Sequence, residues 1–218
     1  MKMKSIFIIG IFAICFACNQ KKSSESKIED IQVSATNLPY FESPDFTPKW
    51  EKVKHKIPDF SFINQNGINI TNATYKGKIY IADFFFTTCP GICPKLTKNM
   101  NILQELYKEN DDILLLSHSV MPWVDSVDKL ETYALNNNVD SKKWNLVTGD
   151  KDQLYAIARN GYFADEDFKK TLDESEFIHT ENFILVDKEG YIRGVYNGTI
   201  ELDLQRLIRH IKLLEKEV

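Results

Sequence analysis

The chain has 218 residues, of which 43% are hydrophobic and 27% are charged, and its formal net charge is -4. This length is sufficient for one domain with a hydrophobic core. A net negative charge without a basic stripe argues against a nucleic-acid-binding protein. Four cysteines are too few for a disulfide-dense scaffold.

The first residues have the pattern of a secretory signal. MKMK supplies a basic start, and SIFIIGIFAICFAC is an apolar run too short to span a membrane comfortably as a mature helix. Its end, CFAC at 15–18, resembles a bacterial lipobox in which Cys15 replaces the usual leucine. The resemblance implies that residues 1–17 are removed as a lipoprotein-type signal peptide and that Cys18 is lipidated. The alternative is a cysteine that lies at a signal end by coincidence.

Residues 18–37 are polar and predict a lipidated tether, followed by a folded domain at 38–218. We therefore expect an extracytoplasmic protein, anchored to the lipid bilayer of a bacterial membrane through Cys18, with its domain facing the periplasm. Only Cys89 and Cys93 then remain in the domain. Because that compartment is oxidising, a thiol pair there must be oxidised, kept reduced by a partner, or protected by a bound metal.

Strand and helix patterns alternate along the rest of the chain. The expected strands are 57–63 and 68–70 around the turn NQNG, 78–86, 113–119, 144–147, 182–187 and 191–198. The expected helices are 95–110, 125–136, 150–160 with Asp150 as its cap, and 202–216. This order predicts an α/β, thioredoxin-like fold, with a central mixed sheet flanked by helices and an N-terminal β-hairpin extension.

The stretch FFFTTCPGICPKL at 84–96 carries the chemistry. Its two cysteines, Cys89 and Cys93, follow the end of an expected buried strand, where the active sites of open α/β sheets lie. Pro94 suits the first position of a helix, so Cys93 is expected at a helix N-terminus, which favours a thiolate. The three-residue gap allows both a disulfide and convergence on one ion. Cu(I) suits two thiolates and one imidazole, whereas zinc needs a fourth ligand with no obvious candidate.

Four histidines are candidates for the third ligand. His179 precedes ENFILVD, the strand that lies beside the cysteine helix in thioredoxin-like proteins, and it stands near the place of their cis-proline. His118, at the end of ILLLSHS, is the second candidate because it also reaches the functional edge of the sheet. His55 and His210 are expected to be solvated.

Over residues 38–215 the chain resembles the SCO/SenC family, the copper-handling assembly factors of cytochrome c oxidase. The matching segments are PDFSFINQNG at 58–67, FFFTTCPGICPKL at 84–96, SVMPWVDSVDKLETYA at 119–134, WNLVTGD at 144–150 and HTENFILVDKEGYIRGVYNG at 179–198. The resemblance implies that Cys89, Cys93 and His179 bind one copper ion, as Cu(I) or Cu(II). The implied partners are the copper-bearing subunit of cytochrome c oxidase and a thiol reductant or another copper carrier.

The chain departs from the family pattern at three places. Ile178 stands where family members often have an acidic residue, SVMP replaces S-V-D-P, and FFFTT replaces an aromatic-Gly-Phe-T strand end. These changes spare the three implied ligands. They alter the residues around the metal and the contacts with a partner.

Three functions fit this pattern. The first is a metallochaperone that delivers copper to the binuclear site of cytochrome c oxidase and is not primarily an enzyme. The second is a thiol-disulfide reductase, with Cys89 and Cys93 as a redox-active disulfide pair, that keeps the cysteines of that site reduced. The third is a peroxidase of the peroxiredoxin type. The first is favoured, because a dedicated oxidoreductase is expected to keep the shorter C-x-x-C and its facing proline.

Asp83 is a further candidate inside the apolar strand, six positions before Cys89. A carboxylate at this offset also occurs in thioredoxin, so we hypothesise that Asp83 tunes the two sulfurs or promotes thiol exchange. Its negative charge would raise the pKa of nearby thiols. The alternative is that Asp83 lies at the strand edge and is hydrogen-bonded to the backbone.

Overall fold

The structure is a computed structural model that describes residues 37–164 and 180–217. The expected leader, Cys18, the tether up to residue 36 and His179 all lie outside the described residues. Within the described residues, no helix has both the length and the apolar character needed to cross a membrane.

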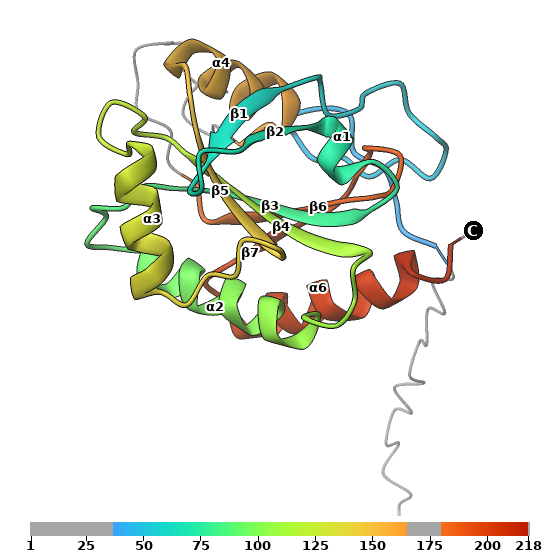
Figure 1. The fold of residues 1–218 in the computed structure, drawn as a ribbon. Coiled ribbons are helices and arrows are strands. Elements are labelled where there is room, and N and C mark those ends of the chain that lie inside the picture. The colour runs from blue at the N-terminus through green and yellow to red at the C-terminus, as the bar shows by residue number, and fades with distance from the viewer. Residues whose placement is uncertain (1–36, 165–179, 218) are drawn as a thin grey trace, which may run out of the picture. The chain divides into compact units, whose positions relative to one another are not determined.

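A seven-stranded sheet forms the centre of the domain (Figure 1). Its strands are β1 (Ser61–Asn64), β2 (Asn69–Thr71), β3 (Ile79–Phe85), β4 (Ile113–Ser119), β5 (Trp144–Thr148), β6 (Asn182–Val186) and β7 (Ile192–Asn197), in the spatial order β2-β1-β5-β4-β3-β6-β7. Strands β3, β4 and β5 are parallel, whereas β1 joins β5 and β6 joins β3 in antiparallel pairs. This mixed sheet, with a hairpin at each end, confirms the predicted fold class.

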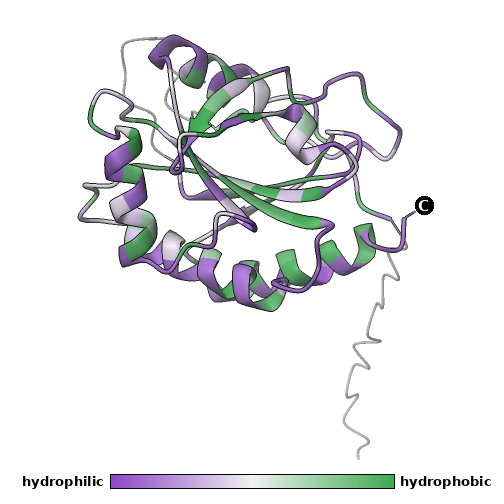
Figure 2. Cartoon of the chain, in the orientation of Figure 1, coloured by the Kyte–Doolittle hydropathy of each residue, from purple (hydrophilic) through white to green (hydrophobic). Residues whose placement is uncertain are grey.

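Helices cover both faces of the sheet (Figure 1). One face carries α2 (Cys93–Leu106), α3 (Val127–Asn136) and α6 (Glu201–Leu214), and the other carries α1 (Asn72–Tyr75), α4 (Lys151–Ala156) and the π-helix η1 (Ile157–Gly161). Figure 2 shows hydrophobic and hydrophilic residues alternating along α2 and α6. This is the pattern expected of helices that bury one side against a sheet.

Strand β3 is apolar on both sides because it lies inside the sheet under both helical layers. Its side chains alternate: Ile81 and Phe85 join the core beneath α2, whereas Tyr80 and Phe84 join the core beneath α4. The same alternation places Asp83 on the α2 side. The strand therefore ends just before the loop that carries Cys89. It also places the carboxylate of Asp83 beneath the cysteine helix.

Several expected boundaries need correction. The cysteine helix begins at Cys93 and ends at Leu106, so Pro94 is its second residue rather than its first. Asp150 caps α4 as expected, accepting from the backbone of Gln153 at 3.0 Å. The expected helix 150–160 turns into a π-helix at residue 157. The helix α1 was not anticipated; Thr71 caps it through Ala73 N at 3.2 Å.

Arg193 on β7 ties the two ends of the described domain together, and we call this arrangement the Arg193 clasp. Its guanidinium donates to Leu38 O at 2.6 Å and pairs with Asp187 at 3.0 Å and Glu217 at 2.8 Å. Asp187 follows β6, whose last residue lies opposite Tyr80 near the start of β3. The clasp therefore lies at the amino end of β3, and the cysteines follow the carboxyl end.

Candidate metal and thiol site

The cysteine loop, residues 86–92, joins β3 to α2 at the carboxyl edge of the parallel strands. Cys93 is the first residue of α2 and is buried in the core beneath that helix, with 4% of its surface exposed. Cys89 is half-buried and packs against the same core. Both are free thiols. The sequence therefore places one sulfur on a rigid helix and the other on the loop that precedes it.

The two thiols differ in acidity. Burial raises the pKa of Cys89, but hydrogen bonds from the Cys93 thiol and from three consecutive backbone amides, Gly91 to Cys93, outweigh it and lower the pKa overall. Burial raises the pKa of Cys93, and its hydrogen bond to Cys89 and the negative charges of Cys89 and Asp83 raise it further. Cys89 is thus the more acidic of the two thiols, and the Cys93 thiol donates to it.

This assignment corrects the sequence prediction, which favoured a thiolate at Cys93. Position at a helix N-terminus does favour the anion. However, the amides at the start of α2 point toward Cys89, the residue before them, rather than toward the buried sulfur of Cys93. A sulfur that precedes the helix can accept from the free amides, whereas a sulfur inside the first turn cannot reach most of them.

An open cleft of about 330 Å³ gives access to the sulfurs. Both cysteines line it, together with apolar groups of Phe84, Phe86 and Ile92. Thr180 lines the same cleft. Thr180 directly follows His179, the predicted third ligand, in the chain. The described part of the chain therefore resumes beside the cysteines, at the residue after His179.

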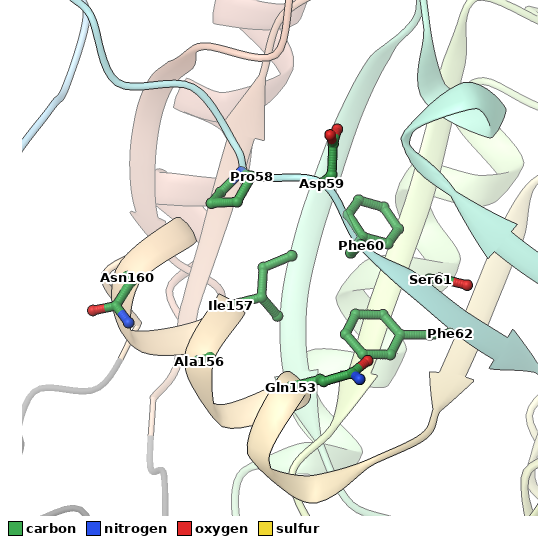
Figure 3. A pocket seen from close by; sticks show the side chains of 9 residues that line it. All are labelled: Pro58, Asp59, Phe60, Ser61, Phe62, Gln153, Ala156, Ile157 and Asn160. Atoms are coloured by element: carbon green, nitrogen blue, oxygen red, sulfur yellow. The ribbon is translucent and has the colours of Figure 1, made fainter.

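A larger cleft, of about 570 Å³, lies elsewhere, between the approach to β1 and the helix pair α4–η1 (Figure 3). Phe60, Phe62 and Ile157 project into it, and of the residues that the structure describes Asp59 is the only charged one in its lining. It contains neither cysteine. The smaller cleft is therefore the better candidate site, because it brings together groups with perturbed acidity.

His118 does not join the cysteines. Its side chain is fully buried, stacked on Phe84 with ring centroids 5.0 Å apart, and enclosed by Phe60, Phe62 and Tyr162. Within the described part of the chain, neither ring nitrogen has a hydrogen bond of normal geometry. Burial lowers the pKa of His118 to about 3, and an interaction with the Asp83 backbone opposes this only in part. Among the described residues, no three His, Cys, Asp or Glu side chains form a group able to hold a metal. The second candidate for the third ligand is therefore not supported.

The expectation that two histidines are solvated was wrong. His55 is half-buried, with Nε2 2.8 Å from Gly161 O. His210 is also half-buried, with Nδ1 2.7 Å from the Tyr196 hydroxyl. Each has a structural partner away from the sulfurs.

Asp83 is buried in the sheet, with 2% of its surface exposed, and accepts a hydrogen bond from the Ser117 hydroxyl on β4. Ser117 in turn accepts from Trp144 Nε1 at 2.8 Å. Burial raises the pKa of Asp83 to about 7, although the Ser117 hydrogen bond opposes this. The alternative of a strand-edge carboxylate bonded to the backbone is therefore wrong.

Sequence reasoning missed a second buried carboxylate near the cysteine loop. Asp125, just before α3, is fully buried and accepts from Thr87 and Ser119. A signal was present: Thr87 and Ser119 follow or end adjacent parallel strands, so they must meet at one edge of the sheet. The sequence prediction instead placed Asp125 at the start of the expected helix 125–136 and gave it no role at the site.

Comparisons with known proteins show the family and the fold of the chain. The model of the SCO1/SenC family matches residues 49–214. The SCO1 protein homolog of Bacillus subtilis is 32% identical over 167 residues, which covers 74% of this chain and 84% of that protein.

Solved structures show the same fold. A SCO1/SenC family lipoprotein from Bacillus anthracis has a TM-score of 0.65 at 28% identity, covering 77% of this chain and 99% of the solved one. BsSco, a member of the Sco family of cytochrome c oxidase assembly proteins with a disulfide switch, has a TM-score of 0.64 at 28% identity, covering 77% and 98%. ScoI of Arabidopsis thaliana with copper bound has a TM-score of 0.56 at 24% identity, covering 73% and 98%, a likeness that shows the fold alone.

Proposed function

The chain belongs to the SCO1/SenC family, and from this premise we propose that it is a copper metallochaperone. It binds one copper ion through Cys89, Cys93 and His179 and delivers copper to the binuclear copper site of cytochrome c oxidase. The observation that carries the proposal is the open cleft in which two free thiols and Thr180, the neighbour of His179, lie together.

The donor set fits a soft ion. The hydrogen bonds that lower the pKa of Cys89 also reduce the cost of deprotonating it, and a metal binds the thiolate. Cys93 adds a second sulfur within hydrogen-bonding distance of the first. The apolar lining from Phe84, Phe86 and Ile92 limits water around the sulfurs, which favours Cu(I) over a hard cation.

The position of the Arg193 clasp supports a membrane-anchored carrier. The described domain starts at the amino end of β3, and the cysteines follow its carboxyl end. A tether attached through a lipid at Cys18 would join the domain at the end remote from the cleft, which leaves the cleft free for a partner. The expected location is a bacterial membrane, with the domain facing the periplasm.

A second function, thiol-disulfide reduction, is favoured by the unequal acidity of the two thiols. The Cys89 thiolate would attack one sulfur of a partner's disulfide and release the other as a thiolate. Cys93, once deprotonated, would then attack Cys89, closing the intramolecular disulfide and releasing the second partner thiol. Asp83 has a pKa of about 7 and its charge acts on Cys93, so it is the candidate acceptor of the Cys93 proton.

The test is a copper titration of the reduced protein, comparing wild type with His179→Ala and with His118→Ala. Loss of tight one-to-one binding in His179→Ala alone is the expected result, because His118 is enclosed by aromatic rings. Equal binding by wild type and His179→Ala would contradict the ligand set. Reduction of a disulfide in a peptide from the oxidase copper subunit, measured alongside, separates carrier from reductase.

A further inference from the structure

We propose that Asp125, Thr87 and Ser119 form a clamp that positions the cysteine loop for metal binding. In this arrangement, Asp125 is a positioning residue that acts on the copper site through Thr87. The inference rests on the proposed function, because it concerns the same site.

The contacts of the clamp are short and numerous. The Thr87 hydroxyl donates to Asp125 Oδ1 at 2.6 Å, and the Thr87 backbone amide lies 3.3 Å from each carboxylate oxygen. The Ser119 hydroxyl donates to Asp125 Oδ2 at 2.6 Å and accepts from Met121 N at 3.1 Å. One carboxylate therefore joins the chain leaving β3 to the chain leaving β4.

Because the carboxylate of Asp125 is buried, its oxygens need hydrogen-bond donors from the protein. Asp125 and Ser119 are both fully buried. A carboxylate removed from water is costly unless hydrogen bonds replace its hydration, and here three donor groups do so. Asp125, in the loop before α3, thus points into the protein rather than toward solvent, and there its carboxylate contacts Thr87.

The clamp extends the sheet beyond its last paired residues. Phe85 lies opposite Ser119 in the β3–β4 ladder, and Val120 N donates to Phe85 O at 2.9 Å. The strands then separate, and Asp125 spans the gap between Ser119 and Thr87. The chain is consequently held in place two residues before Cys89.

The clamp fixes one end of the segment that carries the sulfurs. The other end is fixed by α2, whose first residue, Cys93, is buried in the core. Between them, Cys89 N donates to Phe86 O at 3.3 Å, and Pro90 and Gly91 are exposed. With both ends held, Cys89 stays close to Cys93 before any ion arrives. Without the clamp, ion binding must also order the loop, which weakens binding.

The test compares two substitutions at one position. Thr87→Val removes the hydroxyl at nearly constant volume, and Thr87→Ser keeps it. Thr88→Val is the matched control, because Thr88 is the adjacent threonine and is exposed. Cu(I) affinity is measured by competition with a chromophoric chelator. Amide hydrogen exchange over residues 86–92 is measured without metal, and the melting temperature is measured for every variant.

We expect Thr87→Val to bind Cu(I) about tenfold more weakly and to exchange its loop amides faster. Thr87→Ser and Thr88→Val should both stay within twofold of wild type. If Thr87→Val exchanges faster but binds Cu(I) as wild type does, the clamp is merely structural and the inference is overturned. Should Thr87→Val fail to fold, Asp125→Asn, which keeps one acceptor oxygen, takes its place with the same expected weakening.

The two proposals fail in different ways. If wild type binds no Cu(I), the metallochaperone function is contradicted, and the positioning role for metal falls with it. If wild type binds tightly, loses binding in His179→Ala and is unaffected by Thr87→Val and Asp125→Asn, the function stands and only the clamp is wrong.

Discussion

Replacing His118 by Leu should remove a large part of the acid sensitivity of the fold. His118 is fully buried in an aromatic enclosure, and among the described residues neither ring nitrogen has a hydrogen bond of normal geometry. Burial lowers its pKa to about 3, although an interaction with the Asp83 backbone opposes this. In the unfolded chain the same imidazole has a pKa of about 6.5. Between these two pKa values the unfolded state binds a proton at His118 and the folded state does not. The free energy of unfolding therefore decreases as the pH falls from about 6.5 toward 3.

The size of the effect follows from these two pKa values. Between pH 7 and pH 5 the loss attributable to His118 is about 2 kcal/mol, since each pH unit below the unfolded pKa contributes up to about 1.36 kcal/mol. His118→Leu has no titrating group and similar volume. It also removes two buried, unsatisfied nitrogens, which cost on the order of 1–3 kcal/mol. The variant should therefore be at least as stable as wild type at pH 7.

The assay is urea unfolding of wild type and His118→Leu at pH 7 and pH 5. Other groups titrate in both proteins, so the informative quantity is the difference between the two pH-dependent losses. We expect the wild type to lose about 2 kcal/mol more than the variant. Equal losses would show that the folded protein admits a proton at His118, and the account of a sealed aromatic enclosure would then be wrong.

Three further substitutions test the thiol site and the fold. Asp83→Asn should lower the pKa of Cys93, because the charge of Asp83 raises it; unchanged rates of thiol alkylation across pH, together with unchanged copper affinity, would remove Asp83 from the mechanism. Cys93→Ala should raise the pKa of Cys89, which loses a hydrogen-bond donor, and a Cys89 that alkylates with the same pH profile would contradict this. Arg193→Met should lower the free energy of unfolding by about 3 kcal/mol, because it leaves the charges of Asp187 and Glu217 unpaired. Lys52→Met, which breaks an exposed pair with Glu189, is its control and should leave urea unfolding unchanged; similar losses in both would refute the special role of the clasp.

The sequence was sufficient for the sheet because hydrophobic periodicity is a strong signal. The apolar run at 78–86 and the run at 113–119 appear as β3 and β4 within one residue at each end. The π-helix after Ala156 left no such signal. Its last residue, Gly161, has no room for a side chain, since an added Cβ would lie 2.9 Å from Ile157 and 3.0 Å from Pro58. Only the packed structure reveals that approach.

The site was predicted only in part, because some of its contacts are local in the chain and others are not. Cys89 and Cys93 are separated by only three residues in the chain, so their proximity follows from local geometry. Which of them is the more acidic thiol depends on the direction of the backbone amides at residues 91–93. That direction follows from where the helix begins. Asp125 was missed because its partner Thr87 is 38 residues away, and the contact arises only when β3 and β4 pair. His179 lies outside the described residues and stays a prediction.

The most direct test of the central claim is X-ray absorption at the copper edge of the loaded protein. The account predicts that two sulfur scatterers and one imidazole nitrogen surround a single copper ion. It also predicts that the imidazole contribution disappears in His179→Ala while both sulfurs remain. A spectrum with no sulfur, or one in which His179→Ala leaves the imidazole contribution intact, would contradict a site built from Cys89, Cys93 and His179.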